Sequence, residues 1–541
     1  MKKTIFSLVA AGLVLTSCNK NTALTAPADS DGSDIVKVAY NPSMLDINES
    51  FIVSGKAASL TYTYKNYATP PIGQDVNGTY WWLAATASTM NRDVVFVTWH
   101  QKELIGGDTR SGAVSAYKWD NSQSKFVYKD QVTFSQTEYY ELTSELNTLN
   151  GTYELFMAGQ RDPSASGYLL ANHGGAVVTR LDYNYITDQF DGASFKQLPL
   201  PGAAATDIVA AAGDYYITTG NGVGSDPNSP AANASFQGGV YKTDYNLNVV
   251  SEAFTGNSTF SDFQAITVDP TAGPTVAGIS TLARSVDANG VSTFGVETYH
   301  DVSSNLNTMD PVNFWTVDSN DAREAIIEYY GSGLAASNSE AMIAEQYAQN
   351  QPVGCQTADP LLANYCAHLA GEFKGARMKA MTNYERMGLT YVTTGNHNDE
   401  NLFVSLGDWG FFSADYFDGG LVGLTYADYK GNHGYCANLA YDPNNGVVYY
   451  ASAEGGLSVV AGANYNGGIL INEGDLIGKF VPQTGAGLPA NPAAYVGSNT
   501  IINTLPDEFM VKDASVYEVP SGGTVVVIAN GEGGVYFVNQ F

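Results

Sequence analysis

The chain has 541 residues, of which 54 are acidic and 25 are basic, so its formal net charge is −29. A surface of this charge repels nucleic-acid phosphates, and we therefore expect no nucleic-acid partner. Hydrophobic residues make up 44% of the chain, which excludes a simple disordered protein, and its 56 glycines and 35 tyrosines are typical of a β-rich protein with many turns.

The first residues predict an export signal. Two lysines follow Met1, and the apolar run after them, residues 5–16, is shorter than the roughly 20 residues that a membrane-spanning helix needs. Residues 15–18, Leu-Thr-Ser-Cys, resemble the lipobox of bacterial lipoproteins, in which the signal is removed before the cysteine and the cysteine is acylated. The resemblance implies a signal peptide over residues 1–17 and membrane attachment through a lipid on Cys18. Residues 18–35 are small and polar, which predicts a flexible tether.

An internal repeat is the main indication of the fold. Residues 447–460 and 525–538 align without a gap, and each consists of an apolar run, a small turn with two glycines and a second apolar run. This pattern predicts the same β-hairpin at both places in the chain, because glycine supplies the positive φ of a tight turn. Weaker copies of the hairpin are expected over residues 94–117, 168–178, 215–241, 334–343 and 402–412.

A further strand is expected before each hairpin, and these strands give the spacing of the repeat. We place their starts near Tyr80, Glu138, Thr206, Phe263, Ala322, Ala376, Gly434 and Asp513. Apart from the last interval, the spacing is steady and suits four-stranded blades with long loops. Blades stacked around an axis bury both faces of every sheet, whereas one strand pair cannot bury its apolar face alone.

The sequence therefore predicts an all-β fold, a single β-propeller over residues 36–541. It has about eight four-stranded blades, with seven as the alternative count. We expect the final strand, residues 535–538, to pair with early strands between residues 36 and 67 and so to close the ring. Two tandem β-sandwich domains are the competing interpretation, against which the middle of the chain shows neither a linker nor a change in composition.

One region departs from the repeat. Residues 344–375 have helical propensity and apolar spacing, which predicts a short helical insertion in the propeller. Cys355 and Cys366 lie in this insertion, and because an exported protein resides where disulfides persist, we expect them to form one. A zinc site that uses His368 or His433 is the alternative, although no metal-ligand spacing supports it.

The hairpin motif also resembles a known family. The pattern of an apolar run, Ala-x-x-x-Gly-Gly and a second apolar run, seen in residues 447–460 and 525–538, resembles the LVIVD-type β-propeller repeat of exported lipoproteins of Bacteroidota. The resemblance implies a lipid-anchored propeller at the outer membrane, on its periplasmic or cell-surface side. This family has no common enzymatic activity, so the resemblance implies no catalytic residues.

Motifs for chemistry are few. The six histidines share no ligand spacing, and the chain contains no HExxH, GxSxG or P-loop motif, so we name no catalytic residue and expect no obligatory cofactor. The best polar cluster lies in residues 395–401, where side-chain oxygens suitable for calcium belong to Asn396, Asn398, Asp399 and Glu400. An ordinary exposed loop between strands is the alternative, because the same residue types dominate turns.

The tryptophans also allow two interpretations. Trp81, Trp82, Trp99, Trp119, Trp315 and Trp409 form either a sugar-stacking platform or packing between blades, and we expect packing. We expect a non-enzymatic binding or scaffolding subunit of an envelope complex, whose partners are other envelope proteins bound through loops such as 220–237, 344–375 and 462–506. The alternative is a carbohydrate-binding protein or a carbohydrate-active enzyme that takes a glycan at the propeller mouth.

Overall fold

The computed structural model describes residues 34–36, 38, 40–54, 59–75, 78, 80–101, 111–161, 175–220, 238–253, 262–269, 277–286, 292–301, 311–318, 388–392, 400–405, 411–417, 420–427, 439–442, 444–451, 456–461, 463–465, 468–470, 476–480 and 511–540. Regular secondary structure in these ranges is entirely β. None of the described residues belongs to a helix long and apolar enough to cross a membrane.

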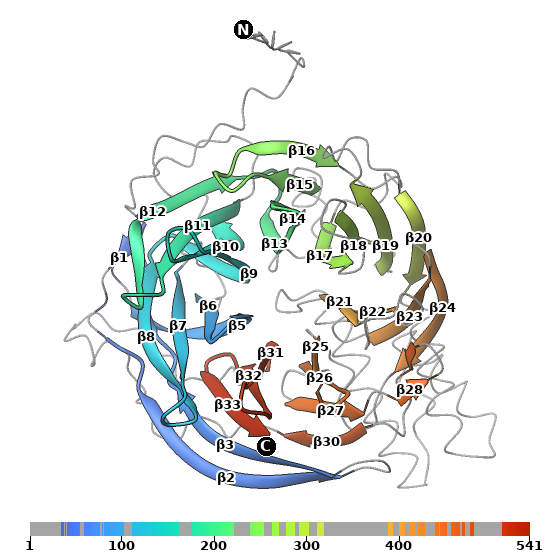
Figure 1. The fold of residues 1–541 in the computed structure, drawn as a ribbon. Helices are drawn as coiled ribbons and strands as arrows, with labels where there is room; N and C mark the ends of the chain where they lie inside the picture. The colour runs from blue at the N-terminus through green and yellow to red at the C-terminus, as the bar shows by residue number, and fades with distance from the viewer. Residues whose placement is uncertain are drawn as a thin grey trace, which may run out of the picture.

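The described strands form seven large antiparallel sheets arranged as the blades of a ring (Figure 1). Blade 1 contains β4 (Ile72–Gln74), β5 (Tyr80–Asn91), β6 (Val94–Gln101), β7 (Gly112–Asp120) and β8 (Lys125–Phe134), with β1 (Ile35–Val36) on its outer edge. Blade 2 contains β9 (Thr137–Asn147), β10 (Thr152–Arg161), β11 (Ala176–Asn184) and β12 (Gln189–Pro199). Blade 3 contains β13 (Ala204–Ala211), β14 (Asp214–Gly220), β15 (Val240–Thr243) and β16 (Val249–Ala253).

The remaining blades follow the same plan. Blade 4 contains β17 (Asp262–Asp269), β18 (Ala277–Val286), β19 (Ser292–Asp301) and β20 (Pro311–Asp318). Blade 5 contains β21 (Gly388–Val392), β22 (Glu400–Ser405), β23 (Phe411–Phe417) and β24 (Gly420–Ala427). Blade 6 contains β25 (Leu439–Asp442), β26 (Val447–Ala451), β27 (Leu457–Ala461) and β30 (Leu476–Phe480), and β28 (Ala463–Tyr465) pairs separately with β29 (Gly468–Leu470). Blade 7 combines β31 (Asp513–Glu518), β32 (Thr524–Ala529) and β33 (Val535–Gln540) with β3 (Ser59–Ala68) and β2 (Met44–Ser54) from the start of the chain.

The predicted closure of the ring is confirmed. β33 pairs antiparallel with β3, with Tyr64 opposite Val538 and Tyr67 opposite Tyr536. The rings of Tyr67 and Tyr536 stack with centroids 5.1 Å apart. Around the centre, the innermost strands β5, β9, β13, β17, β21, β25 and β31 contact one another in this order, and β31 contacts β5. The early strands β2 and β3 and the last strands β31 to β33 thus form one blade (Figure 1).

The described ring has seven blades, which is the alternative count and one fewer than the leading count of eight. The fifth predicted start, near Ala322, falls between β20 and β21 and lies outside the described residues. β17 of blade 4 contacts β21 of blade 5 directly, so these blades are neighbours and no other blade separates them. Five of the other predicted starts lie within two residues of an observed innermost strand, and the starts near Ala376 and Gly434 precede β21 and β25.

The core lies between the blades. Val526 and Ile528 of β32 pack toward blade 6, whereas Val525, Val527 and Ala529 pack toward blade 1. β6 alternates in the same way, with Phe96 facing blade 2 and Val97 facing blade 7. Because successive strand residues point to opposite faces and both faces are covered, these strands are continuous apolar runs.

The repeated hairpin is the middle pair of strands of a blade. β26 pairs with β27 and β32 with β33, as the alignment of residues 447–460 with 525–538 predicts. Gly534 has φ +87°, and a Cβ added there would lie 2.2 Å from the carbonyl oxygen of Ala68 on β3. Glycine is therefore required where the last hairpin turns against the closing strand.

One expected hairpin is placed incorrectly by the sequence. β11 begins at Ala176 and pairs with β10, which ends at Arg161, so the partner of β11 precedes residues 168–171. The apolar alternation of β10 decides the pairing, because Leu155 faces blade 1 and Phe156 faces blade 3. The helical insertion at 344–375 and the hairpin copy at 334–343 lie outside the described residues.

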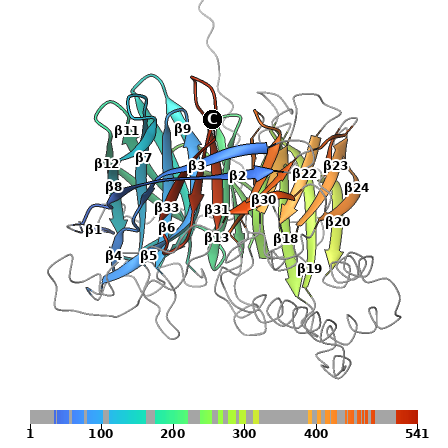
Figure 2. The same cartoon turned by 90° about the horizontal axis from the view of Figure 1, so that it is seen from below.

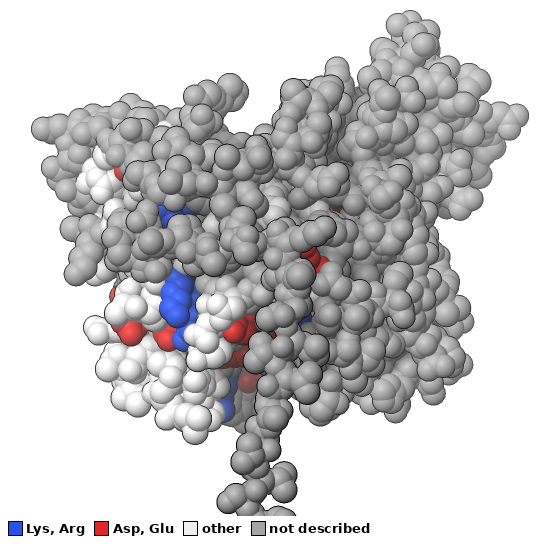
Figure 3. Space-filling view, turned by 90° about the horizontal axis from the view of Figure 1, so that it is seen from above, with Lys and Arg blue, Asp and Glu red and all other residues white. Residues whose placement is uncertain are grey.

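The strands of every blade run between two faces of the ring, which Figure 2 shows from the side. Here the entry face is the one at which the innermost strands begin and the second strands end, and the exit face is the opposite one. On the described part of one side of the ring, Lys and Arg side chains lie beside Asp and Glu side chains (Figure 3). Mixed surface pairs of this kind contribute little to stability, so the packing between blades holds the ring together.

Candidate functional site

Buried charged side chains gather at the entry face where blades 7, 1 and 2 meet. His100 near the end of β6, Glu138 near the start of β9 and Lys512 just before β31 are 3%, 1% and 4% exposed. Lys512 Nζ lies 3.1 Å from His100 Nε2, and His100 Nδ1 lies 3.9 Å from Glu138 Oε2. Tyr140 donates a hydrogen bond of 2.6 Å to Glu138 Oε1 and lies 3.0 Å from Gln160 Oε1.

This His100 cluster connects the closing blade to the first two blades. If the Lys512 ammonium donates to His100 Nε2, the imidazole proton resides on Nδ1, which faces Glu138. Lys512 and Glu138 are buried on the two sides of His100, and removal of one charged side chain would leave the other without its compensating charge. The cluster is therefore a polar connection between three blades at the point where the ring closes.

A second feature recurs near the start of the innermost strands. In β5, β9, β13 and β17, one residue bulges out of the pairing register: Thr86, Tyr140, Thr206 and Gln264. A bulge bends the strand and redirects its side chains. The recurrence of the bulge in blades 1 to 4 shows that it belongs to the repeat.

The bulged threonines bind the neighbouring blades. Thr86 Oγ1 lies 3.0 Å from Thr98 Oγ1 and donates to the carbonyl oxygen of Tyr139 in blade 2, at 2.9 Å. Thr206 Oγ1 has the same arrangement, 3.1 Å from Thr218 Oγ1 and 2.8 Å from the carbonyl oxygen of Phe263 in blade 4. These hydroxyls satisfy polar groups inside the ring and fix one blade to the next.

Two carboxylates on innermost strands make similar connections. Asp207 Oδ2 accepts a hydrogen bond of 2.8 Å from the backbone N–H of Ile266 in blade 4, and its Oδ1 accepts one of 2.7 Å from Ile208. Asp513 Oδ2 accepts from the backbone N–H and the hydroxyl of Ser88 in blade 1, at 2.6 and 3.1 Å. Each carboxylate thus binds the innermost strand of the next blade.

Asp207 and Asp513 also interact across the ring. Burial and, to a smaller extent, the negative charge of Asp513 raise the pKa of Asp207 to about 7, against the lowering effect of its two backbone hydrogen bonds. Blades 3 and 7 are not neighbours, so this charge acts through the centre of the propeller. A carboxyl group with a pKa near neutrality can hold or release a proton at physiological pH.

The residues named from the sequence for binding and modification lie mostly beyond these sites. Cys18, Cys355, Cys366, Asn396, Asn398 and Asp399 are outside the described residues. Glu400 is the first residue of β22, where it pairs with Tyr416. The lipid, the disulfide and the calcium site remain predictions. Among the described residues, no group of three or more His, Cys, Asp or Glu side chains could hold a metal ion.

The packing role predicted for the tryptophans is confirmed for four of them. Trp81, Trp82, Trp99 and Trp119 are at most 6% exposed. Trp99 Nε1 donates to Ser115 Oγ at 3.0 Å, inside blade 1. Trp315 lies on β20, and Trp409 lies outside the described residues. These four indole rings fill space around blade 1 and are not a surface platform.

Sequence reasoning missed the roles of the residues at the starts of the innermost strands. Glu138, Thr206 and Asp513 marked predicted strand starts, yet their polar side chains were not recognised as connections between blades. The available signal was their position: a polar residue stands within the first three residues of β9, β13, β17 and β31. Only the ring geometry shows which residue of a neighbouring blade each of them contacts.

Comparison with known proteins adds little. No protein-family model matches the chain, and no curated protein matches it. Among solved structures, Sqt1 of Saccharomyces cerevisiae has a TM-score of 0.40 at 9% identity, over 84% of this chain and 95% of that chain. Two structures of Sqt1 from Chaetomium thermophilum have TM-scores of 0.38 and 0.37 at 9% and 10% identity, over 85% and 87% of this chain and 96% and 97% of theirs. At this level of similarity they carry no argument about function, and the described architecture is that of an all-β propeller.

Proposed function

We propose that the protein is a lipid-anchored β-propeller of the outer membrane that acts as a non-enzymatic binding or scaffolding subunit of an envelope complex. The observation that carries the proposal is the use of buried polar groups as connections between blades. Asp513 holds Ser88, Thr86 holds the carbonyl group of Tyr139, and Asp207 holds Ile266. A closed ring with such connections is a rigid support for binding segments.

Long segments of the chain attach to one face of this support. Segments 162–174, 221–237, 319–387 and 481–510 each connect described strands that end and begin at the entry face. Three of them overlap the loops that the sequence suggested for binding. Insertions in repeat proteins gather on one face, which is often the binding face. The entry face is therefore where we place the partners, which are other envelope proteins.

Membrane attachment in this proposal is supported by the lipobox-like residues 15–18 and by the likeness of the repeat to that of exported lipoproteins. The tether predicted over residues 18–35 extends too far by two residues, because Asp34 is buried and Ile35 begins β1, so a lipid on Cys18 would hold the propeller at the outer membrane through residues 19–33. Stable attachment needs more than one acyl chain, which the modification of lipoproteins supplies.

The proposal is tested by replacing the entry-face segments one at a time. The chain, with its lipid, is extracted from native membranes in several mild detergents and its size is measured. We expect the chain to be recovered in a complex with other proteins. We also expect that replacing residues 221–237 or 481–510 with a short Gly-Ser linker removes at least one of these proteins from the complex. Exchange of the short exit-face turn at residues 520–522 is the matched control. Recovery of the wild-type chain alone in every detergent would contradict the proposal.

A second candidate function is binding or cleavage of a glycan at the propeller mouth. One observation favours it: Asp207, with a pKa of about 7, has a second carboxylate, Asp513, near enough to raise that pKa. A glycosidase uses a protonated and an ionised carboxyl group in this way. Asp207→Asn should then abolish glycan hydrolysis without loss of folding. If a broad glycan panel shows neither binding nor cleavage by the wild-type protein, this candidate is rejected.

A further inference from the structure

Apolar side chains are exposed on the exit face of blades 2 and 3. Leu149 is 97% exposed, Ile186 74%, Tyr245 50% and Tyr185 36%. Together these four residues are named the exit-face patch. They occupy three turns, which join β9 to β10, β11 to β12 and β15 to β16. Contiguous exposed apolar side chains with a polar surround mark interaction sites on soluble domains.

The turns of blade 2 hold their part of the patch together. Tyr185 donates a backbone hydrogen bond of 3.2 Å to the carbonyl oxygen of Gly151. A Cβ added to Gly151 would lie 3.2 Å from Tyr185 Cε1 and 3.3 Å from Ile186 Cδ1, so the two turns are in contact. The ring of Tyr185 also packs edge-on against Tyr153, with centroids 5.9 Å apart.

Side-chain hydrogen bonds fix the backbone of all three turns. Asn147 Oδ1 accepts from the N–H of Leu149 at 3.1 Å, and Asn184 Oδ1 accepts from the N–H of Ile186 at 2.9 Å. Asp244 Oδ1 accepts from the N–H of Asn246, next to Tyr245, at 2.9 Å. A turn held in this way presents its apolar side chain with little conformational entropy left to lose on binding.

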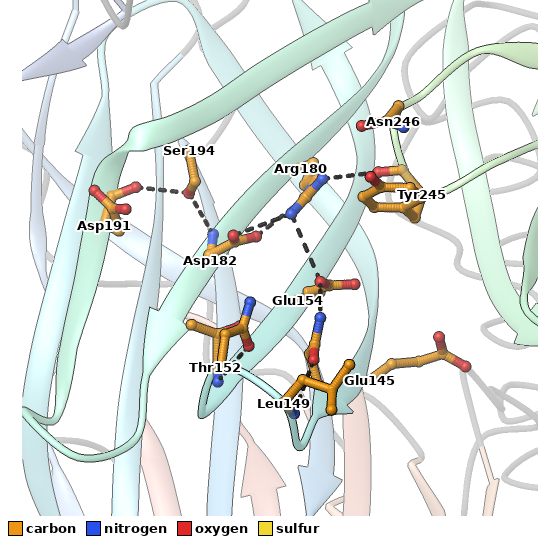
Figure 4. Close-up of polar contacts among 12 residues, drawn as sticks. Glu145, Leu149, Thr152, Glu154, Arg180, Asp182, Asp191, Ser194, Tyr245 and Asn246 are labelled. Atoms are coloured by element: carbon orange, nitrogen blue, oxygen red, sulfur yellow. Dashed lines mark hydrogen bonds and ion pairs between the residues drawn. The ribbon is translucent and has the colours of Figure 1, made fainter.

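A chain of polar contacts joins the two blades beneath the patch (Figure 4). Asn147 Nδ2 donates to Glu154 Oε1 at 3.1 Å, and Arg180 lies 3.7 Å from the same oxygen. Arg180 donates to the carbonyl oxygen of Tyr245 at 3.0 Å and lies 5.2 Å from the centre of its ring. Asp182 binds the same guanidinium with two contacts of 3.0 Å. Leu149 and Tyr245 are thus fixed relative to each other across the boundary between blades.

The surroundings of the patch are acidic. The carboxylates in or next to the exit-face turns of blades 1 to 3 are Asp93, Asp120, Glu145, Glu154, Asp182, Asp188, Asp191, Asp214 and Asp244, and the bases are Arg92, Lys118, Lys125, Lys129, Arg180 and Lys242. Lys118 and Lys129 both bind Asp188, each at 2.8 Å. The excess of carboxylates agrees with the net charge of −29. Such a rim repels an anionic lipid surface or a second copy of this chain and attracts a basic one.

We propose that the exit-face patch docks a protein partner that presents an apolar pocket surrounded by lysine and arginine side chains. Leu149 and Ile186 enter the pocket, and the acidic rim selects and orients the partner. Apolar anchors at the centre of an interface supply most of its binding energy, while charged rims set the rate and specificity of association. This surface extends the proposed binding role to the face opposite the entry face.

The test begins with a photo-cross-linking amino acid at position 149 of the full-length chain in its native cells. Ser521 is the matched control position, because it lies in the corresponding turn of blade 7, between β31 and β32, and is also exposed. We expect position 149 and not position 521 to cross-link to another protein, within a segment rich in lysine and arginine.

The cross-linked protein is then purified and its affinity measured against wild-type chain and against the Leu149→Ser/Ile186→Ser variant. Burial of one leucine side chain corresponds to roughly a ten- to hundredfold change in affinity, so the double variant should bind at least about tenfold more weakly. Wild-type affinity should also fall as salt is raised. Both substituted side chains are largely exposed, so thermal unfolding of the variant should match that of the wild type.

Several outcomes overturn the inference. Two of them are cross-linking results: a cross-link to a second copy of this chain, and the absence of any cross-link specific to position 149. The other two are binding results: equal affinity of the wild-type chain and the double variant for the cross-linked protein, and binding to anionic phospholipid vesicles by the wild type but not by the double variant. If the chain still assembles with partners through entry-face segments while position 149 captures nothing, this inference fails and the proposed function stands.

Discussion

Asp207 allows a quantitative test of the polar connections inside the ring. Its pKa is about 7 in the folded protein, against an ordinary value of 3.8, because burial and the charge of Asp513 disfavour ionisation. Between these two values the unfolded chain has released a proton that the folded chain retains, so the free energy of unfolding falls as pH rises. At about 1.4 kcal/mol per pH unit, the titration of this one group lowers the free energy of unfolding by roughly 2–3 kcal/mol between pH 5 and pH 8.

The Asp207→Asn variant removes the titration and keeps one acceptor oxygen for the backbone N–H groups of Ile208 and Ile266. The free energy of unfolding is measured in urea at pH 5 and pH 8. The difference between variant and wild type should shift in favour of the variant by about 2–3 kcal/mol from pH 5 to pH 8. Asp120→Asn is the control, because hydrogen bonds from Ser122 and Gln123 lower the pKa of Asp120 to about 2 and it stays ionised throughout this range. If Asp207→Asn and the wild type respond equally to pH, the proposed burial of this carboxyl group is wrong.

Three further predictions concern the blade-connecting threonines, the lipid anchor and the disulfide. Thr86→Val and its counterpart Thr206→Val each leave a buried carbonyl group without its hydroxyl donor. Each variant should lower the free energy of unfolding, measured in urea titrations, by about 1–3 kcal/mol. Changes near zero would show that these hydroxyls do not connect the blades. Cys18→Ser should move the protein from the membrane fraction to the soluble fraction, and unchanged membrane association would reject the lipid anchor. Peptide mapping without reductant should recover Cys355 and Cys366 in one disulfide-linked pair, whereas two free thiols in the exported protein would refute the pairing.

The class of fold could be predicted because each blade repeats a local pattern. Val525 to Ile528 form an apolar run, since alternate residues enter the cores on the two sides of blade 7. The glycine turn at Gly534 marks where that run reverses. Both signals depend on neighbouring residues in the chain, so the sequence shows them directly, and the closing role of the last strand follows from its position.

The choice between eight and seven blades, and one pairing, could not be settled in this way. The start assigned near Ala322 preceded the weak hairpin copy at residues 334–343, and the contact between β17 and β21 shows that no blade separates blades 4 and 5. The hairpin at residues 168–178 was chosen for its glycine turn, while the strand that pairs with β11 is the earlier run of β10. Turn composition is a weaker signal than the alternation that buries a strand on both faces.

The polar connections lie beyond sequence reasoning for a geometric reason. Asp207 and Asp513 are in blades 3 and 7, and only the ring brings their charges near each other. His100, Glu138 and Lys512 likewise come from three blades. No spacing along the chain indicates such groups, because their distance depends on how many blades close the circle.

Closure of the ring by β3 and β33 is the feature on which a rigid binding platform depends, and an engineered disulfide tests it most directly. Thr63 and Asn539 are opposite each other in this pair of strands, and directly opposite antiparallel residues have Cα atoms within the range that a disulfide spans. In a Cys18→Ser background, Thr63→Cys with Asn539→Cys should form an intramolecular bond, identified by mass spectrometry of the linked peptides, whereas Thr63→Cys with Ser521→Cys should not. No bond between positions 63 and 539, or a bond only between two chains, would contradict a ring closed by its own ends.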